Sequence, residues 1–155
     1  MAFITTGLTS GGLTAHYQIK YDDSLSQADG RDRGNALIPV CEGDFTIMTN
    51  WFGGIALPYA IPYEVDINPG PAWSASWGSG PPITVTPGNG SSIDLVRFLL
   101  VSEVTEMFML EQGLGWSPLA SSEGSAGKDC RISWPLNFLS PLDRHCVLRT
   151  CPIPG

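Results

Sequence analysis

The sequence predicts an α+β fold in which a small mixed or antiparallel sheet packs against two helices. Of its 155 residues, 43% are hydrophobic and 15% are charged, which is enough apolar material for one domain with a core. Several short segments of alternating polarity indicate strands, and two longer segments with apolar residues three and four positions apart indicate helices. Their order along the chain is strand, helix, three strands and long helix, which is typical of an α+β domain.

The first strand and the first helix follow each other in the N-terminal third. Thr14–Tyr21 alternates polar and apolar side chains, as a half-buried strand does. From about Asp32 to Trp51 the apolar spacing is helical. We expect Pro39 to kink or split this helix, because proline lacks the backbone N–H. Gly53 and Gly54 end it.

Three short strand candidates occupy the middle of the chain. They are Tyr59–Ile67, Trp73–Trp77 and Ile83–Thr86, and the turn sequences NPGP, GSGPP and PGNG surround them. Prolines at their margins favour edge positions in the sheet, since proline cannot donate a ladder hydrogen bond.

The long second helix contains the residues of greatest chemical interest. Ser91 or Ser92 caps its start and Gly113 ends it. Apolar residues cover nearly its whole circumference, so we expect it to be mostly buried.

Ser102, Glu103 and Glu106 occupy adjoining positions on this helix, because residues three and four apart are neighbours. Two interpretations remain open: a narrow solvated stripe, or a polar cleft that faces the sheet near Ile83–Thr86. The second interpretation predicts a raised pKa for at least one carboxyl group, since the pair would be partly desolvated.

The stretch LLVSEVTEMFM, together with CEGDFTIMTNWFGG and SSEGSAG, resembles a group of bacterial zincin-like proteins with a degenerate metal motif. Zincin metallopeptidases carry His-Glu-x-x-His on their central helix, where the two histidines bind zinc and the glutamate activates water. By that spacing Ser102 stands at the first histidine, Glu103 at the catalytic glutamate and Glu106 at the second histidine. The resemblance spans residues 14–127 and implies a zincin-like subdomain, truncated at its C-terminus.

The resemblance implies a protein without metallopeptidase activity and without a cofactor, because both zinc histidines are replaced. One alternative is a metal-dependent hydrolase with Glu103 as general base and Glu106 as a metal ligand. Another is a carbohydrate- or peptide-binding module that uses Trp51, Trp73 and Trp77. In each binding interpretation the partner is an unidentified peptide or carbohydrate.

The last 28 residues differ in character from the rest. We therefore divide the chain into a domain, 1–127, and an irregular tail, 128–155, that is rich in cysteine and proline. In the similar group the GSAG segment leads into an amphipathic helix close to GEGLSHFLAAQFL. DNA for that peptide can be written so that deleting one guanine yields GKDCRISWPLNFL, the sequence of residues 127–139. Our hypothesis is that the tail is a frameshift product.

Charge and hydropathy argue against nucleic acid and membranes as partners. The formal net charge of -7 argues against a nucleic-acid surface, which needs clustered lysine and arginine. We find no signal peptide and no apolar run of about 20 residues, so we expect a cytoplasmic protein that makes no membrane contact. His16 lies on the polar face of the first strand, where we expect an exposed imidazole.

Overall fold

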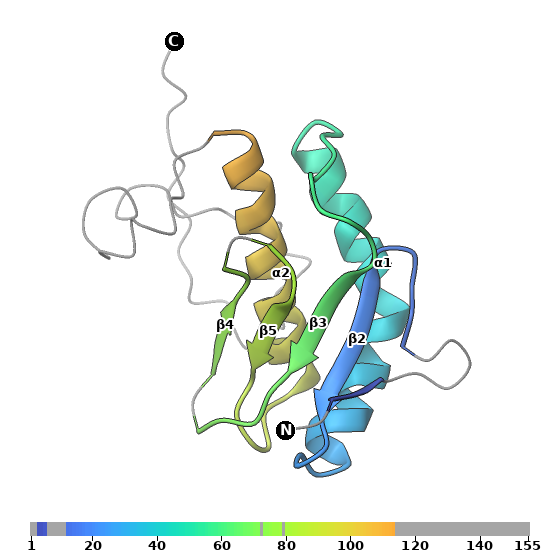
Figure 1. Ribbon diagram of the computed structural model, residues 1–155, viewed down its shortest axis with the longest axis vertical. Helices are drawn as coiled ribbons and strands as arrows, with labels where there is room; N and C mark the ends of the chain where they lie inside the picture. The colour runs from blue at the N-terminus through green and yellow to red at the C-terminus, as the bar shows by residue number, and fades with distance from the viewer. Residues whose placement is uncertain (1–2, 6–11, 72, 79, 114–155) are drawn as a thin grey trace, which may run out of the picture. The chain divides into compact units, whose positions relative to one another are not determined.

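A five-stranded mixed sheet and two long helices make up the computed structural model of this protein (Figure 1). The structure describes residues 3–5, 12–71, 73–78 and 80–113, all within one compact unit, Met1–Leu114. The tail 128–155 and its frameshift hypothesis lie outside these residues. The elements are β1 (Phe3–Thr5), β2 (Tyr17–Asp22), a π-helical turn (Ala28–Asp32), α1 (Arg33–Trp51), β3 (Tyr63–Ile67), β4 (Ser74–Ser76), β5 (Ile83–Thr86) and α2 (Ile93–Glu111).

The strand order in the sheet is β1-β2-β3-β5-β4. β2, β3 and β5 run parallel, with Tyr17 opposite Tyr63 and Val65 opposite Ile83. β1 and β4 pair antiparallel to their neighbours and form the two edges. The predicted α+β class with a mixed sheet and two helices is therefore confirmed.

Both helices cover the same face of the sheet (Figure 1). α1 connects the parallel strands β2 and β3 and packs on β2, whereas α2 follows β5 and packs on β5 and β4. Alternate side chains of the three parallel strands point into this layer and are buried, as the period of a strand requires. Phe45 of α1 and Phe108 of α2 meet there, with ring centroids 5.7 Å apart.

The first helix does not split at Pro39. α1 continues through this residue, which is exposed, while Leu37 and Cys41 on either side are buried. Proline removes one backbone hydrogen bond, but burial of the inner face of α1 outweighs that loss. The expected split is therefore wrong. Gly53 and Gly54 end the helix in the left-handed region, with φ of 74° and 77°.

The other boundaries agree closely with the sequence pattern. β5 coincides with the predicted Ile83–Thr86, and Ser92 caps α2 by accepting a hydrogen bond from the Leu95 N–H. β3 begins later than predicted, directly after Pro62, which cannot donate a ladder bond. The sequence did not predict β1. No helix among the described residues is long and apolar enough to cross a membrane.

Candidate functional site

The C-terminal half of α2 places two glutamates against the rest of the fold. Glu103 is only 7% exposed, and Glu106 is half-buried. Ser102, beside them on the helix, is also half-buried. The solvated-stripe interpretation is therefore wrong for Glu103. α2 packs on β5 and β4, which lie at one edge of the sheet. These two strands are therefore the neighbours of the helix that carries the glutamates.

Burial controls the electrostatics of the pair. It raises the pKa of Glu103 from 4.5 to about 7, with a further contribution from the nearby Glu106. Among the described residues, we find no hydrogen-bond donor to the Glu103 carboxyl. Burial also raises the pKa of Glu106, and the nearby Trp77 side chain lowers it in part. The predicted raised pKa is confirmed for both groups.

Two aromatic residues complete this arrangement. Trp77 follows β4 and is 5% exposed, and its side chain lies near the Glu106 carboxyl. Its ring meets that of Tyr59 edge to face, with centroids 5.9 Å apart. Burial and the nearby Glu111 raise the pKa of Tyr59. We refer to Glu103, Glu106, Trp77 and Tyr59 as the carboxyl–aromatic cluster.

Replacing Glu103 with glutamine should make the protein more stable at pH 8 but not at pH 5. Between its ordinary pKa of 4.5 and about 7, folded Glu103 keeps a proton that the unfolded chain has lost. The free energy of unfolding therefore falls as pH rises through this window. Allowing for solvent near the pair, we expect a loss of about 2 kcal/mol, which glutamine abolishes because it does not ionise. Urea unfolding at both pH values measures the difference.

The matched control is Glu111→Gln, an exposed glutamate at the end of the same helix. This variant should show the same pH dependence of stability as the unmodified protein. If the stability of the Glu103→Gln variant depended on pH as strongly as that of the unmodified protein, the assignment of a raised pKa to Glu103 would be contradicted.

The other predicted tryptophans lie elsewhere. Trp51 is exposed at the end of α1, where its ring contacts that of Phe52 at 5.8 Å. Trp73 precedes β4 and is 64% exposed. Of the three tryptophans proposed to bind a ligand, the structure thus brings Trp77 to the glutamates of α2.

His16 has a partner that its place on a polar strand face did not predict. Its Nδ1 lies 2.7 Å from Glu42 Oε2, and its backbone N–H donates to Glu42 Oε1. The imidazole stacks on Phe45 at 4.0 Å. The side chain is only one-third exposed, so it connects the start of β2 to α1.

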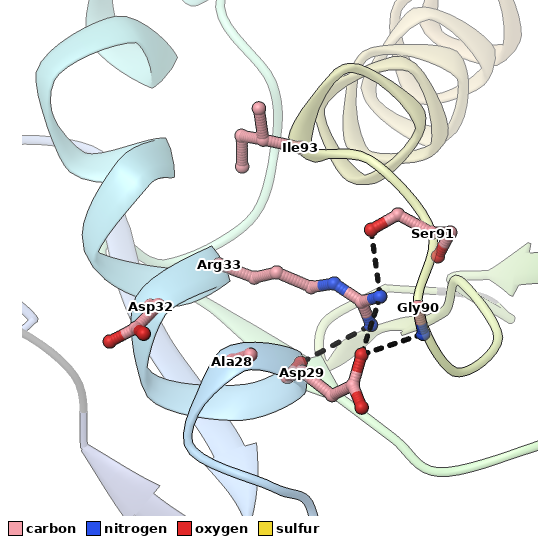
Figure 2. Close-up of a pocket in the computed structure, with 7 residues that line it drawn as sticks. All are labelled: Ala28, Asp29, Asp32, Arg33, Gly90, Ser91 and Ile93. Carbon is pink, nitrogen blue, oxygen red and sulfur yellow. Dashed lines mark hydrogen bonds and ion pairs between the residues drawn. The ribbon is translucent and has the colours of Figure 1, made fainter.

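A second group of polar residues surrounds a pocket of about 300 Å³ between the π-helical turn and the loop before α2 (Figure 2). Arg33 is buried and forms an ion pair with Asp29 at 2.7 Å. Arg33 also donates to the carbonyl of Ser91, and the Gly90 N–H donates to Asp29. These charged groups satisfy one another, so the arrangement links the turn to the loop and leaves little unpaired charge for a ligand.

Replacing Asp29 with alanine should lower the free energy of unfolding by about 1–2 kcal/mol, because Arg33 remains buried without its carboxylate. Asp32→Ala is the control. Asp32 lines the same pocket but is exposed, and its contact with Arg31 is long at 3.6 Å, so we expect almost no change. Urea unfolding compares the two variants, and equal losses would contradict the linking role of Asp29.

Within the described ranges, no three His, Cys, Asp or Glu side chains lie close enough together to hold a metal ion. No protein-family model, curated protein or solved structure matches the chain. The interpretation of the carboxyl–aromatic cluster therefore depends on its own geometry.

Proposed function

We propose that this chain is a zincin-like protein without zinc peptidase activity, which binds an extended peptide along β4. The observation that carries the proposal is the packing of α2, which bears Glu103 and Glu106, on the edge strand β4. In the zincin arrangement an edge strand lies alongside the central helix, so that an extended substrate fits next to both. β4 is an edge strand of this sheet, and α2 packs on it.

The residues at the zinc positions do not fit a zinc ion. Ser102 offers a neutral hydroxyl in place of an imidazole, which is a poor ligand for zinc. Structural and catalytic zinc sites use at least three protein ligands, mainly Cys, His and carboxylates. The described residues bring no such group of three together. This donor set supports binding over zinc-dependent cleavage.

The edge of β4 supplies a physical means of binding. Among the described strands, β4 pairs with β5 alone, so its other side can accept the main chain of a peptide. Ser74 and Ser76 are exposed on this strand and do not block such an approach. An added strand there would pass beside Trp77.

One observation favours a second candidate, a hydrolase in which Glu103 acts as general base. A pKa of about 7 is close to the value at which a base works best near neutral pH. The carbohydrate-binding alternative relies on the exposed Trp51 and Trp73, because Trp77 is buried.

Nuclear magnetic resonance of the full chain tests the peptide proposal. The probe is a set of blocked, alanine-based hexapeptides with one variable position. We expect shifts of the amide signals of Ser74–Ser76 and of the Trp77 indole, and none at Phe3–Thr5 of β1, the opposite edge. Shifts at β1 equal to those at β4, or no binding, would overturn the proposal.

Two further measurements separate the candidates. We expect the purified protein to carry no stoichiometric zinc or manganese by plasma mass spectrometry and to leave the peptides uncleaved. Stoichiometric metal together with cleavage that the Glu103→Gln variant has lost would instead establish the hydrolase.

A further inference from the structure

We propose that Asp22 and Asp66 bind a magnesium ion at the carboxyl ends of the parallel strands β2 and β3. This inference goes beyond the proposed function and does not depend on it, because the two aspartates lie on the central strands and not on β4 or α2. It follows from their buried oxygens, from the register of the sheet, and from the pairing of the lysine beside them.

Both aspartates carry a buried oxygen that lacks a hydrogen-bond partner. Asp22 is completely buried and Asp66 is 5% exposed. The Ser24 N–H and hydroxyl donate to Asp22 Oδ1, but Asp22 Oδ2 and Asp66 Oδ1 have no partner among the described residues. A carboxylate oxygen buried without a donor costs free energy, so such atoms are rare in folded proteins. A cation would supply the interaction that both oxygens lack.

The register of the sheet brings the two aspartates to one place. Lys20 of β2 is directly opposite Asp66 of β3. Asp22 lies two residues beyond Lys20, so the alternation of side chains places it on the same face of the sheet as Asp66. From the usual strand spacing and rise per residue, the Cα atoms of these diagonal neighbours are about 8 Å apart, which a single ion between two carboxylates can bridge. Asn68, two residues beyond Asp66, adds an amide oxygen at the same end of the sheet.

The position in the fold is one where ligands commonly bind. Asp22 is the last residue of β2, and Asp66 is the last but one of β3. The carboxyl ends of β2, β3 and β5 point to the same end of the sheet (Figure 1). In open sheets with parallel central strands, ligands bind outside these ends. The two carboxylates thus gather at the end of the sheet where this architecture places binding sites.

The nearby positive charge does not neutralise the aspartates. Lys20 is the one basic residue in the five described strands, and its Nζ lies 2.6 Å from Glu64 Oε2. Burial, with a smaller contribution from Glu64, raises the pKa of Asp66, and Lys20 offsets this only in part. The face therefore carries two carboxylates, Asp22 and Asp66, beyond the one that Lys20 pairs with.

The donor set suits magnesium in particular. Carboxylate and amide oxygens are hard ligands, and magnesium is usually held by one or two carboxylates while it keeps several of its waters. It does not need a group of three acidic, histidine or cysteine ligands, which the described residues do not offer. Calcium takes six to eight oxygen ligands, more than Asp22, Asp66 and Asn68 supply, so we expect it to bind less tightly.

Nuclear magnetic resonance of the full chain, titrated with magnesium chloride at neutral pH, tests this inference. We expect saturable shifts of the amide signals of Asp22, Asp66 and Asn68, with half-saturation at about 1 mM, the weak end of the range for oxygen-ligand sites. Asp22→Asn and Asp66→Asn should each weaken binding at least tenfold. Asp23→Asn is the matched control, because it removes an exposed carboxylate next to Asp22 and should leave binding unchanged.

Thermal unfolding of the same variants gives a second readout and establishes that each is folded. Without magnesium, Asp66→Asn should not lower the unfolding temperature, because it removes a buried charge that lacks a partner. Saturating magnesium should raise the unfolding temperature of the unmodified protein and of Asp23→Asn, but not that of the other two variants. Shifts that sodium chloride of equal ionic strength reproduces, shifts that persist in both Asp22→Asn and Asp66→Asn, or no shifts at all would overturn the inference.

Discussion

Replacing Phe108 with alanine is expected to lower the free energy of unfolding by about 4 kcal/mol, the range found when a fully buried phenylalanine is truncated. Phe108 is completely buried on α2. Its ring lies parallel to that of Phe52, with centroids 5.3 Å apart, and also contacts Phe45. The substitution therefore leaves a cavity where the ring of Phe108 packed against Phe45 and Phe52. Guanidinium unfolding followed by circular dichroism measures the loss.

Phe98→Ala is the matched control, since it removes the same side chain from the same helix. Phe98 is 39% exposed, so little apolar surface returns to water and no closed cavity forms. We expect a change below about 1 kcal/mol. Similar losses in the two variants would contradict the role of Phe108 as a central packing residue.

Replacing Asp44 with alanine is expected to cost about 3 kcal/mol, which is the second largest effect. Asp44 on α1 is buried and accepts two hydrogen bonds at 2.6 Å from Arg97 on α2, one from Nε and one from a terminal nitrogen. This bidentate pair joins the two helices, and its loss leaves the half-buried guanidinium without its carboxylate.

A double-mutant cycle with Arg97→Ala isolates the pair. The double variant should be less destabilised than the sum of the two single variants, because the second substitution removes the guanidinium that had lost its contact with Asp44. Glu111→Ala, which removes an exposed carboxylate at the other end of α2, should change stability by less than about 0.5 kcal/mol. Additive effects of Asp44→Ala and Arg97→Ala would contradict direct coupling.

Local patterns were sufficient to predict most of the fold. The alternation around Tyr17 and Ile19, the apolar strand at Ile83–Thr86 and the cap at Ser92 are properties of neighbouring residues, and the structure contains each of them. Two features depended on tertiary packing. β1 has three residues and exists through pairing with β2, and α1 tolerates Pro39 because its opposite side is buried.

The candidate site, like the fold, could be predicted from the sequence only in part. The spacing of Glu103 and Glu106 placed them together on one helix, and the cleft interpretation of that spacing predicted a raised pKa for at least one of them. The approach of Trp77 to Glu106 and its contact with Tyr59 join different elements, so no local pattern reveals them. The contact of His16 with Glu42 also joins residues that are far apart in the sequence, so a local pattern could not predict it either.

The parallel pairing at the centre of the sheet also determines how the chain reaches this structure. Tyr17 pairs with Tyr63 across the whole of α1, so the entropy of closing a long loop is lost before the central strands gain any contact. α1 contains Pro39 and Gly43 and is a poor helix in isolation, whereas Ile93–Glu111 contains neither residue type. We therefore expect slow folding, on the order of milliseconds to seconds, with a transition state organised around α2 and β5. During synthesis β2 would lack its parallel partner β3 until the whole of α1 had emerged from the ribosome.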